Sequence, residues 1–140
     1  NYTAQLDQYL KDEVIVAAAG NGRIAAATRA DYAVAAAAAL TGSGHDNAVY
    51  ELGGTPFTFA ELAAVITDVT GTKVGYRAVS PAELVQRLTS AGLDAGTAEF
   101  VTALDEGIAR GELDTDSTDL QTLAGRPSTP LADAVRAARQ

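Results

Sequence analysis

The spacing of apolar residues predicts a mixture of helices and short strands. Leu6 and Leu10 stand four positions apart, which predicts a helix over residues 1–11. An apolar, β-prone run over residues 14–16 predicts a strand. This strand is expected to end in a tight turn at residues 20–22, because their Gly-Asn-Gly sequence tolerates the positive φ angles that such a turn needs. A second short strand is expected from Arg23.

Helix-start signals organise the rest of the chain. Each signal combines a capping side chain with an acid three residues later, and the pairs are Thr28 with Asp31, Thr58 with Glu61, and Ser80 with Glu83. The expected helices span residues 28–40, 58–70, 80–91, 95–110, 117–123 and 129–140. Strands are expected at residues 49–52 and 74–79, and the strand–helix–strand order predicts that these two strands pair in parallel.

The composition restricts the kind of protein. The chain has 140 residues, with 10 Lys and Arg against 18 Asp and Glu, and a net charge of −8. This charge argues against nucleic-acid binding through general electrostatics, and no apolar run approaches the roughly 18 residues of a membrane span. The absence of cysteine removes thiolate chemistry and fits a reducing compartment, so a cytoplasmic protein of about one domain is expected. Because the chain begins at Asn1 and contains no Met, we expect a processed product or part of a longer protein.

Most of the negative charge lies in one stretch. Residues 94–119 contain eight acids and one base, Arg110, and therefore carry −7 of the total charge of −8. Arg23 and Arg29 lie in the nearly neutral remainder, where an anionic ligand would be favoured. The acidic stretch would suit a partner protein, and a solvated face explains it equally well.

One glycine pattern matches a dinucleotide-binding fingerprint. Gly20-x-Gly22-x-x-Ala25 follows an apolar strand, as the phosphate turn of such folds does. That chemistry needs a helix to begin at the turn, so that its amide groups meet the phosphates. Here the nearest capping signal is Thr28, and a plain turn is therefore the favoured interpretation.

Other chemical motifs are weaker. Residues 114–119 are rich in Asp but lack the Gly and Glu positions of an EF-hand loop, so a helix-capping loop is favoured over calcium binding. His45 stands beside Ser43 and Asp46, but the members of a catalytic triad come from separate elements. No Tyr is followed by Lys four positions later, so the tyrosine–lysine dyad of short-chain reductases is not in this chain. The sequence offers no metal site.

Three stretches resemble a known family. They are residues 20–33 (GNGRIAAATRADYA), residues 49–54 (VYELGG) and residues 120–131 (LQTLAGRPSTPL). They are similar to the C-terminal half of NmrA-like, atypical short-chain dehydrogenases, most of all to bacterial NAD(P)H:quinone oxidoreductases. The resemblance implies an α/β chain, the helix-rich C-terminal portion of a Rossmann-like NAD(P)-binding fold with a few short strands. Residues 1–140 would form the substrate-binding and lid half, and the dinucleotide-binding N-terminal half would be absent.

The resemblance also implies a reaction and a set of contacts. Hydride would pass from NADPH, or NADH, to a quinone without a flavin. The opening residues Asn1, Tyr2 and Thr3, extending toward Leu6, resemble a family segment beside the nicotinamide, and Arg29 resembles a family arginine near the same site. The pocket walls are expected among Tyr2, Phe57, Phe59 and Tyr76, while no catalytic residue can be assigned.

Three alternatives stay open. The chain could come from a non-enzymatic, NAD(P)-sensing regulator of the same fold that binds a partner protein. The 140 residues alone are expected to be inactive, whichever parent they came from. Arg29 could simply pair with Asp31 or another carboxylate. The choice of quinone, the preference for NADH or NADPH and the formation of a homo-oligomer are not decided by the sequence.

Overall fold

A computed structural model describes residues 2–139. A 3-10 turn, η1 (Tyr2–Gln5), leads into α1 (Leu6–Asp12). The elements that follow are β1 (Val14–Ala17), α2 (Arg29–Thr41), α3 (Phe59–Thr70), β2 (Gly75–Ala78), α4 (Pro81–Ser90), α5 (Ala95–Ala109), α6 (Asp119–Ala124) and α7 (Leu131–Ala138). The predicted helices are all present, with ends shifted by a few residues. Among residues 2–139, no helix has the length and apolar character needed to cross a lipid bilayer.

Two strands form a parallel pair. β1 lies beside β2, with Val14 opposite Gly75 and Ala17 opposite Ala78. The prediction of parallel pairing is correct for the second strand, but its partner is β1 and not residues 49–52, which form no strand. In that segment the N–H of Glu51 bonds the Asp119 side chain at 2.9 Å instead of a neighbouring strand. Residues 49–52 therefore alternate between polar and apolar side chains without forming the backbone hydrogen bonds of a strand.

The helix caps follow the sequence signals. The Thr28 and Asp31 side chains form a reciprocal capping box at the start of α2, and Thr58 and Glu61 form one at the start of α3. At α4 the box is only half formed. The Ser80 hydroxyl accepts the Glu83 N–H, while the Glu83 carboxylate bonds Arg77 and Arg87.

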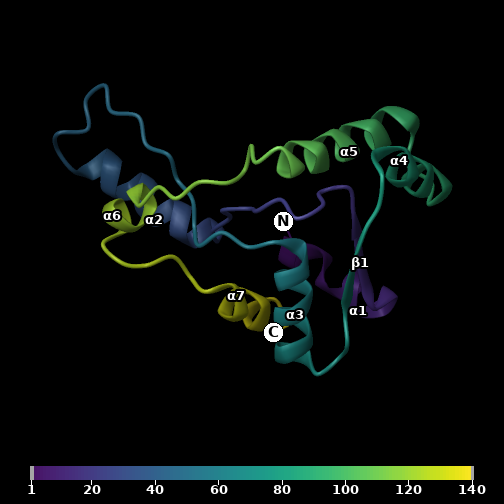
Figure 1. Cartoon of the computed structure of the whole chain (residues 1–140). Helices are drawn as coiled ribbons and strands as arrows, with labels where there is room; N and C mark the ends of the chain where they lie inside the picture. Colours follow the sequence, from purple (N-terminus) through teal and green to yellow (C-terminus); the bar gives the residue numbers. More distant parts are fainter. Residues whose placement is uncertain (1, 140) are drawn as a thin grey trace.

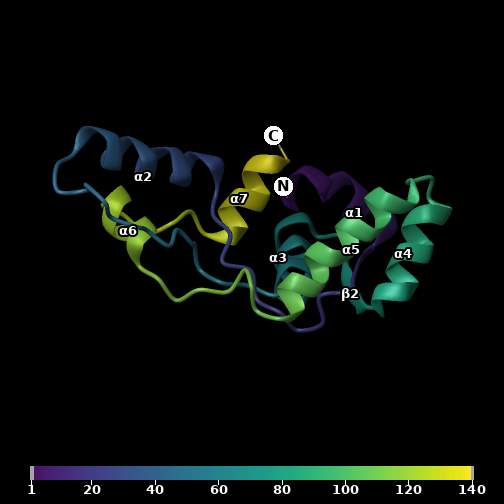
Figure 2. The same ribbon diagram turned by 90° about the horizontal axis from the view of Figure 1, so that it is seen from above.

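The core lies around α3 (Figure 1). α3 packs against α7 and against both strands, and its apolar face buries Leu62 and Ile66 almost completely. Figure 2 shows α2 with α6 at one end of the molecule and the α4–α5 pair at the other, with α3 and α7 between them. The carboxyl ends of β1 and β2 point in the same direction because the strands are parallel, and this edge is where open α/β folds bind ligands.

Candidate functional site

The chain turns sharply after β1. The Gly22 N–H donates to the Ala19 carbonyl at 2.9 Å, and Ile24 then forms an isolated antiparallel bridge with Phe57. The next helix begins only at Arg29. No helix amide ends are therefore present at the glycine turn to meet a phosphate. The plain-turn interpretation of the glycine pattern is confirmed.

An aromatic cluster, made of Tyr2, Phe57, Phe59 and Tyr76, lies next to this turn. The Tyr2 ring meets Phe57 and Phe59 edge-on, with centroids 6.0 and 5.7 Å apart. Phe59 and Tyr76 stack at 5.8 Å. The Tyr76 hydroxyl donates to the Gly20 carbonyl at 2.8 Å, which ties the cluster to the carboxyl edge of the strands.

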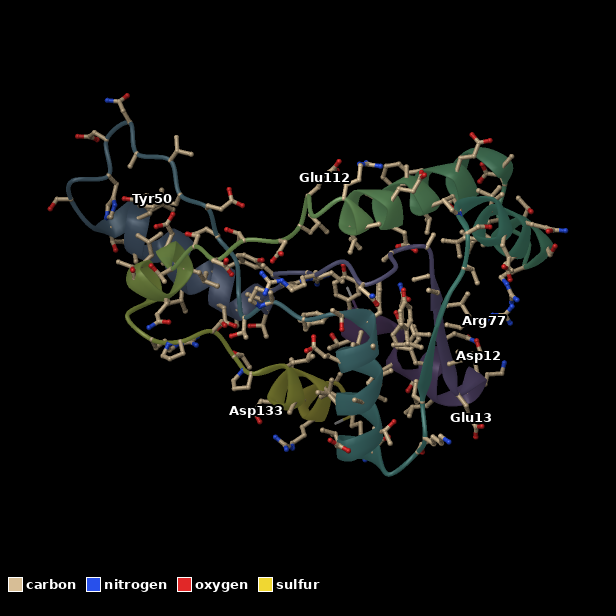
Figure 3. The ribbon with its side chains drawn as sticks, in the orientation of Figure 1. Asp12, Glu13, Tyr50, Arg77, Glu112 and Asp133 are labelled. Atoms are coloured by element: carbon tan, nitrogen blue, oxygen red, sulfur yellow. The ribbon has the colours of Figure 1, made fainter. Side chains whose placement is uncertain are left out.

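A cavity of about 210 Å³, here called the Tyr2 cavity, opens beside the cluster. Two neighbouring walls are the segment 24–26 and the segment 112–115 that follows α5. The Ala25 N–H donates to the Leu113 carbonyl at 2.8 Å and so joins the two walls. Among residues 2–139, the lining residues are Tyr2, Ile24, Ala25, Ala26, Tyr32, Glu51, Leu52, Glu112, Leu113 and Thr115. Figure 3 shows Glu112 just beyond the end of α5.

The four aromatic residues expected as pocket walls come together, but only Tyr2 lines the cavity. Phe57 and Phe59 are buried in the core. Tyr76 is half-buried and faces the glycine turn. The sequence correctly grouped these side chains, while burial decides that Tyr2 alone presents its ring to the open space.

Of the expected cofactor residues that the structure describes, Tyr2 lines the cavity, and Thr3 and Arg29 each lie close along the chain to a lining residue. Asn1 is outside the described residues. Tyr2 lines the cavity, and Thr3 follows it in η1, half-buried. Leu6 is buried in the core and is not available to a ligand. Arg29 is exposed in the first turn of α2, three residues before the cavity-lining Tyr32, a spacing that places both on neighbouring positions of the helix.

The alternative pairing of Arg29 with Asp31 is wrong. Asp31 is 1% exposed and pairs with Arg126 at 2.7 Å. It also accepts hydrogen bonds from the N–H of Thr129 at 3.0 Å and from the Thr28 hydroxyl at 2.8 Å. Within residues 2–139, Arg29 forms no ion pair.

The charge of Asp31 is stabilised despite its burial. Burial by itself raises the pKa of this carboxyl, but the bonds from Thr129, Thr28 and Arg126 outweigh burial and hold the pKa well below its ordinary value. Asp31 therefore joins two of the family-like stretches, residues 20–33 and residues 120–131, through one buried carboxylate. The sequence showed Asp31 only as a capping residue, because its second set of partners lies about one hundred residues away.

Asp105 is the residue that the sequence analysis did not single out. It is half-buried on α5, and its Oδ2 accepts the Ala18 N–H at 2.8 Å, directly after β1. Burial raises the pKa of Asp105. Burial also raises the pKa values of Tyr2 and Tyr76, and the nearby charge of Asp105 raises both further. One member of the acidic stretch thus bonds the chain after β1 and does not belong to a solvated face.

Other acids of that stretch have structural partners. Arg23 bonds Asp114 at 2.9 Å and Asp116 at 3.4 Å, so this arginine is already neutralised by its neighbours.

His45 contacts the Tyr50 hydroxyl through Nδ1 at 2.6 Å and is not engaged with Ser43. The triad, which the sequence did not favour, is not assembled.

The fold matches the C-terminal part of solved NAD(P)-binding, Rossmann-like reductases. NADPH-dependent quinone oxidoreductase QOR2 of Escherichia coli, complexed with NADPH, matches 100% of this chain and 50% of its own with a TM-score of 0.95 and 41% identity. Triphenylmethane reductase of Citrobacter sp., complexed with NADP(H), matches 95% of this chain and 47% of its own with a TM-score of 0.87 and 38% identity. The predicted fold class is confirmed.

Sequence comparison also finds quinone oxidoreductase 2. Quinone oxidoreductase 2 of Escherichia coli (strain K12) is 43% identical over 136 residues, which are 96% of this chain and 48% of that protein. An NmrA-like family domain-containing oxidoreductase of Aspergillus flavus, flvB, is 35% identical over 120 residues, 83% of this chain and 39% of that protein. No protein-family model matches. The chain is thus a homologue of quinone oxidoreductase 2 and of NmrA-like oxidoreductases, as the resemblance predicted, and it spans about half the length of these relatives.

Proposed function

We propose that this chain is the acceptor-side half of a reductase that transfers hydride from NADPH to a quinone. The observation that carries the proposal is the match along 96% of the chain to quinone oxidoreductase 2, together with a ring-sized cavity beside Tyr2. A closed apolar cavity of about 150 Å³ holds one benzene ring, so about 210 Å³ suffices for a quinone ring.

The residues present fit one end of the cofactor and not the other. The Tyr2 cavity offers aromatic and aliphatic side chains to a flat ring, and Arg29 adds an exposed charge near it. The glycine turn opens no helix, so residues 20–25 form no cradle for the pyrophosphate. We therefore assign Asn1, Tyr2, Thr3 and Arg29 to the nicotinamide side, and the phosphates to a dinucleotide-binding half outside residues 1–140.

The role of the chain in the reaction is orientation and exclusion of water. The nicotinamide cofactor supplies the hydride when bound. The Tyr2 ring is held edge-on by Phe57 and Phe59, which fixes one face of the cavity. Ile24 and Leu113 add apolar lining that keeps water from an acceptor ring.

The proposal is tested on the full-length protein with NADPH and a simple benzoquinone, by following the loss of NADPH absorbance. We expect turnover, and we expect Tyr2→Ala to lower kcat/KM for the quinone about tenfold, because ring contacts and apolar burial are lost. Phe100→Ala is the matched control, since Phe100 is an exposed aromatic residue on α5 and does not line the Tyr2 cavity. NADPH binding without turnover would instead support the NAD(P)-sensing regulator.

The cofactor contact of Arg29 has a separate test. Arg29→Ala should weaken NADPH binding, measured by titration, while the KM for benzoquinone stays unchanged. Arg136→Ala is the control, because this arginine is also exposed but pairs with Asp133 on α7. Equal NADPH affinity in both variants would remove Arg29 from the site.

A further inference from the structure

The α4–α5 pair makes few contacts with the other helices and strands, and α5 joins the core through Ile108. The two helices pack chiefly against one another, and Figure 2 shows them at one end of the molecule. The segment after α5 nevertheless forms a wall of the Tyr2 cavity, with Glu112, Leu113 and Thr115. The position of α5 therefore determines the position of the 112–115 wall.

Three contacts hold α5 and the segment that follows it to the residues after β1. The Ala18 N–H bonds Asp105 at 2.8 Å, and the Ala25 N–H bonds the Leu113 carbonyl at 2.8 Å. Between them, Gly22 approaches Ile108 so closely that a Cβ atom would lie 2.2 Å from the Ile108 carbonyl oxygen. The contacts occur in the same order along both segments, so residues 18–25 and 105–113 run side by side.

Of the two hydrogen bonds, only the Asp105 bond is made by a side chain. The carboxylate has no ion-pair partner among residues 2–139. The phenols of Tyr2, Tyr9 and Tyr76 are the titratable groups close enough for its charge to raise their pKa values. A half-buried carboxylate without a cation costs free energy unless a donor satisfies it, and the Ala18 N–H is that donor.

We propose that Asp105 is a positioning residue that holds α5 against the turn after β1 and thereby keeps the 112–115 wall of the Tyr2 cavity in place. The role needs an acceptor oxygen at the position of Oδ2 and does not need the negative charge. This role rests on the proposed function only for its effect on acceptor binding. Its structural effect, slow hydrogen exchange at the turn after β1, does not depend on any activity.

The kinetic test compares variants of the full-length enzyme. Asp105→Ala should raise the KM for benzoquinone about tenfold with little change in kcat, because the hydrogen bond that keeps the 112–115 wall in place is lost. Asp105→Asn keeps a carbonyl acceptor and should restore the KM. Asp105→Glu keeps the charge but displaces the oxygens by one methylene, and it should remain impaired. Glu99→Ala, an exposed acid on the same helix, is the control and should behave as the wild type.

Hydrogen exchange provides the second readout. Asp105→Ala and Asp105→Glu should accelerate exchange at Ala18 and in residues 105–113, while Asp105→Asn and Glu99→Ala should not. An Asn variant as impaired as the Ala variant would show that charge matters, and the proposal would be overturned. Unchanged exchange in both Ala and Glu variants would overturn it as well. If the wild type does not reduce benzoquinone, the proposed function fails, but the exchange data still decide the role of Asp105.

Discussion

Loss of the Asp31 side chain should destabilise this protein more than loss of any exposed acid. Asp31 is 1% exposed and holds α2 to the segment before α7 through Arg126 and Thr129. Asp31→Ala removes the acceptor for the Thr129 N–H and for the Thr28 hydroxyl, and it leaves these donors unpaired. A buried donor left without a partner costs its full desolvation penalty, which is what makes this change severe.

The magnitude follows from the partners. Breaking a buried pair typically costs 3–5 kcal/mol, but Arg126 is 45% exposed and water will solvate it after the change. We therefore expect about 3 kcal/mol for Asp31→Ala. Asp31→Asn keeps one acceptor oxygen and loses the charge, so about half that cost is expected. Asp133→Ala, which breaks an exposed pair with Arg136, should cost under about 1 kcal/mol.

Denaturant unfolding followed by circular dichroism measures these differences, provided that the slope m is unchanged. The pH dependence gives a second check. The pKa of Asp31 is lowered on folding, so its stabilisation is present above the ordinary value of about 4 and is lost as the pH falls below it. The difference in free energy of unfolding between the wild type and Asp31→Asn should shrink by about 1 kcal/mol from pH 5 to pH 3. An Asp31→Ala cost no larger than that of Asp133→Ala, or a pH-independent difference, would refute the reasoning.

Three further outcomes are expected. Gly22→Ala should lower the melting temperature and cost about 1–3 kcal/mol, because the new Cβ would meet the Ile108 carbonyl; an unchanged melting temperature would show that the two backbones are not in contact. Ile66→Ala, in the core at 1% exposure, should cost about 2–5 kcal/mol in denaturant unfolding, whereas Val49→Ala at 94% exposure should cost almost nothing. Burial, and then the neighbouring Tyr2 and Asp105, raise the pKa of Tyr9 to about 12. Ultraviolet titration should therefore show one phenol that ionises at higher pH than the others, and Tyr9→Phe should remove that step. The free energy of unfolding should fall as the pH rises above about 10.

Local signals in the sequence predicted the helices well. Thr28 and Thr58 each cap a helix through an acid three residues later, and Gly71 ends α3 in the left-handed conformation. These features depend on side chains and backbone groups within a few residues of each other, so their physics can be read along the chain. The resemblance to NmrA-like quinone oxidoreductases was equally accessible, because it rests on contiguous stretches.

Pairing between distant segments could not be read in this way. The alternation at residues 49–52 predicted a strand, but the side chain of Asp119 takes the N–H of Glu51. The second strand pairs with β1 instead, about sixty residues earlier. Alternation shows that one side of a segment is buried and does not show which partner covers it.

The candidate site illustrates the same division. Tyr2 and Arg29 came from the resemblance, and the sequence grouped the aromatic side chains that surround Tyr2. By itself, then, the sequence determined the helices, the class of protein and the residue types available to the site. Only the tertiary structure decided that Asp31 pairs with Arg126, that Asp105 bonds Ala18 and that Leu113 bonds Ala25. The physical reason is that each of these contacts joins residues about ninety positions apart, and their distance is fixed by how the helices pack around α3 rather than by any local preference.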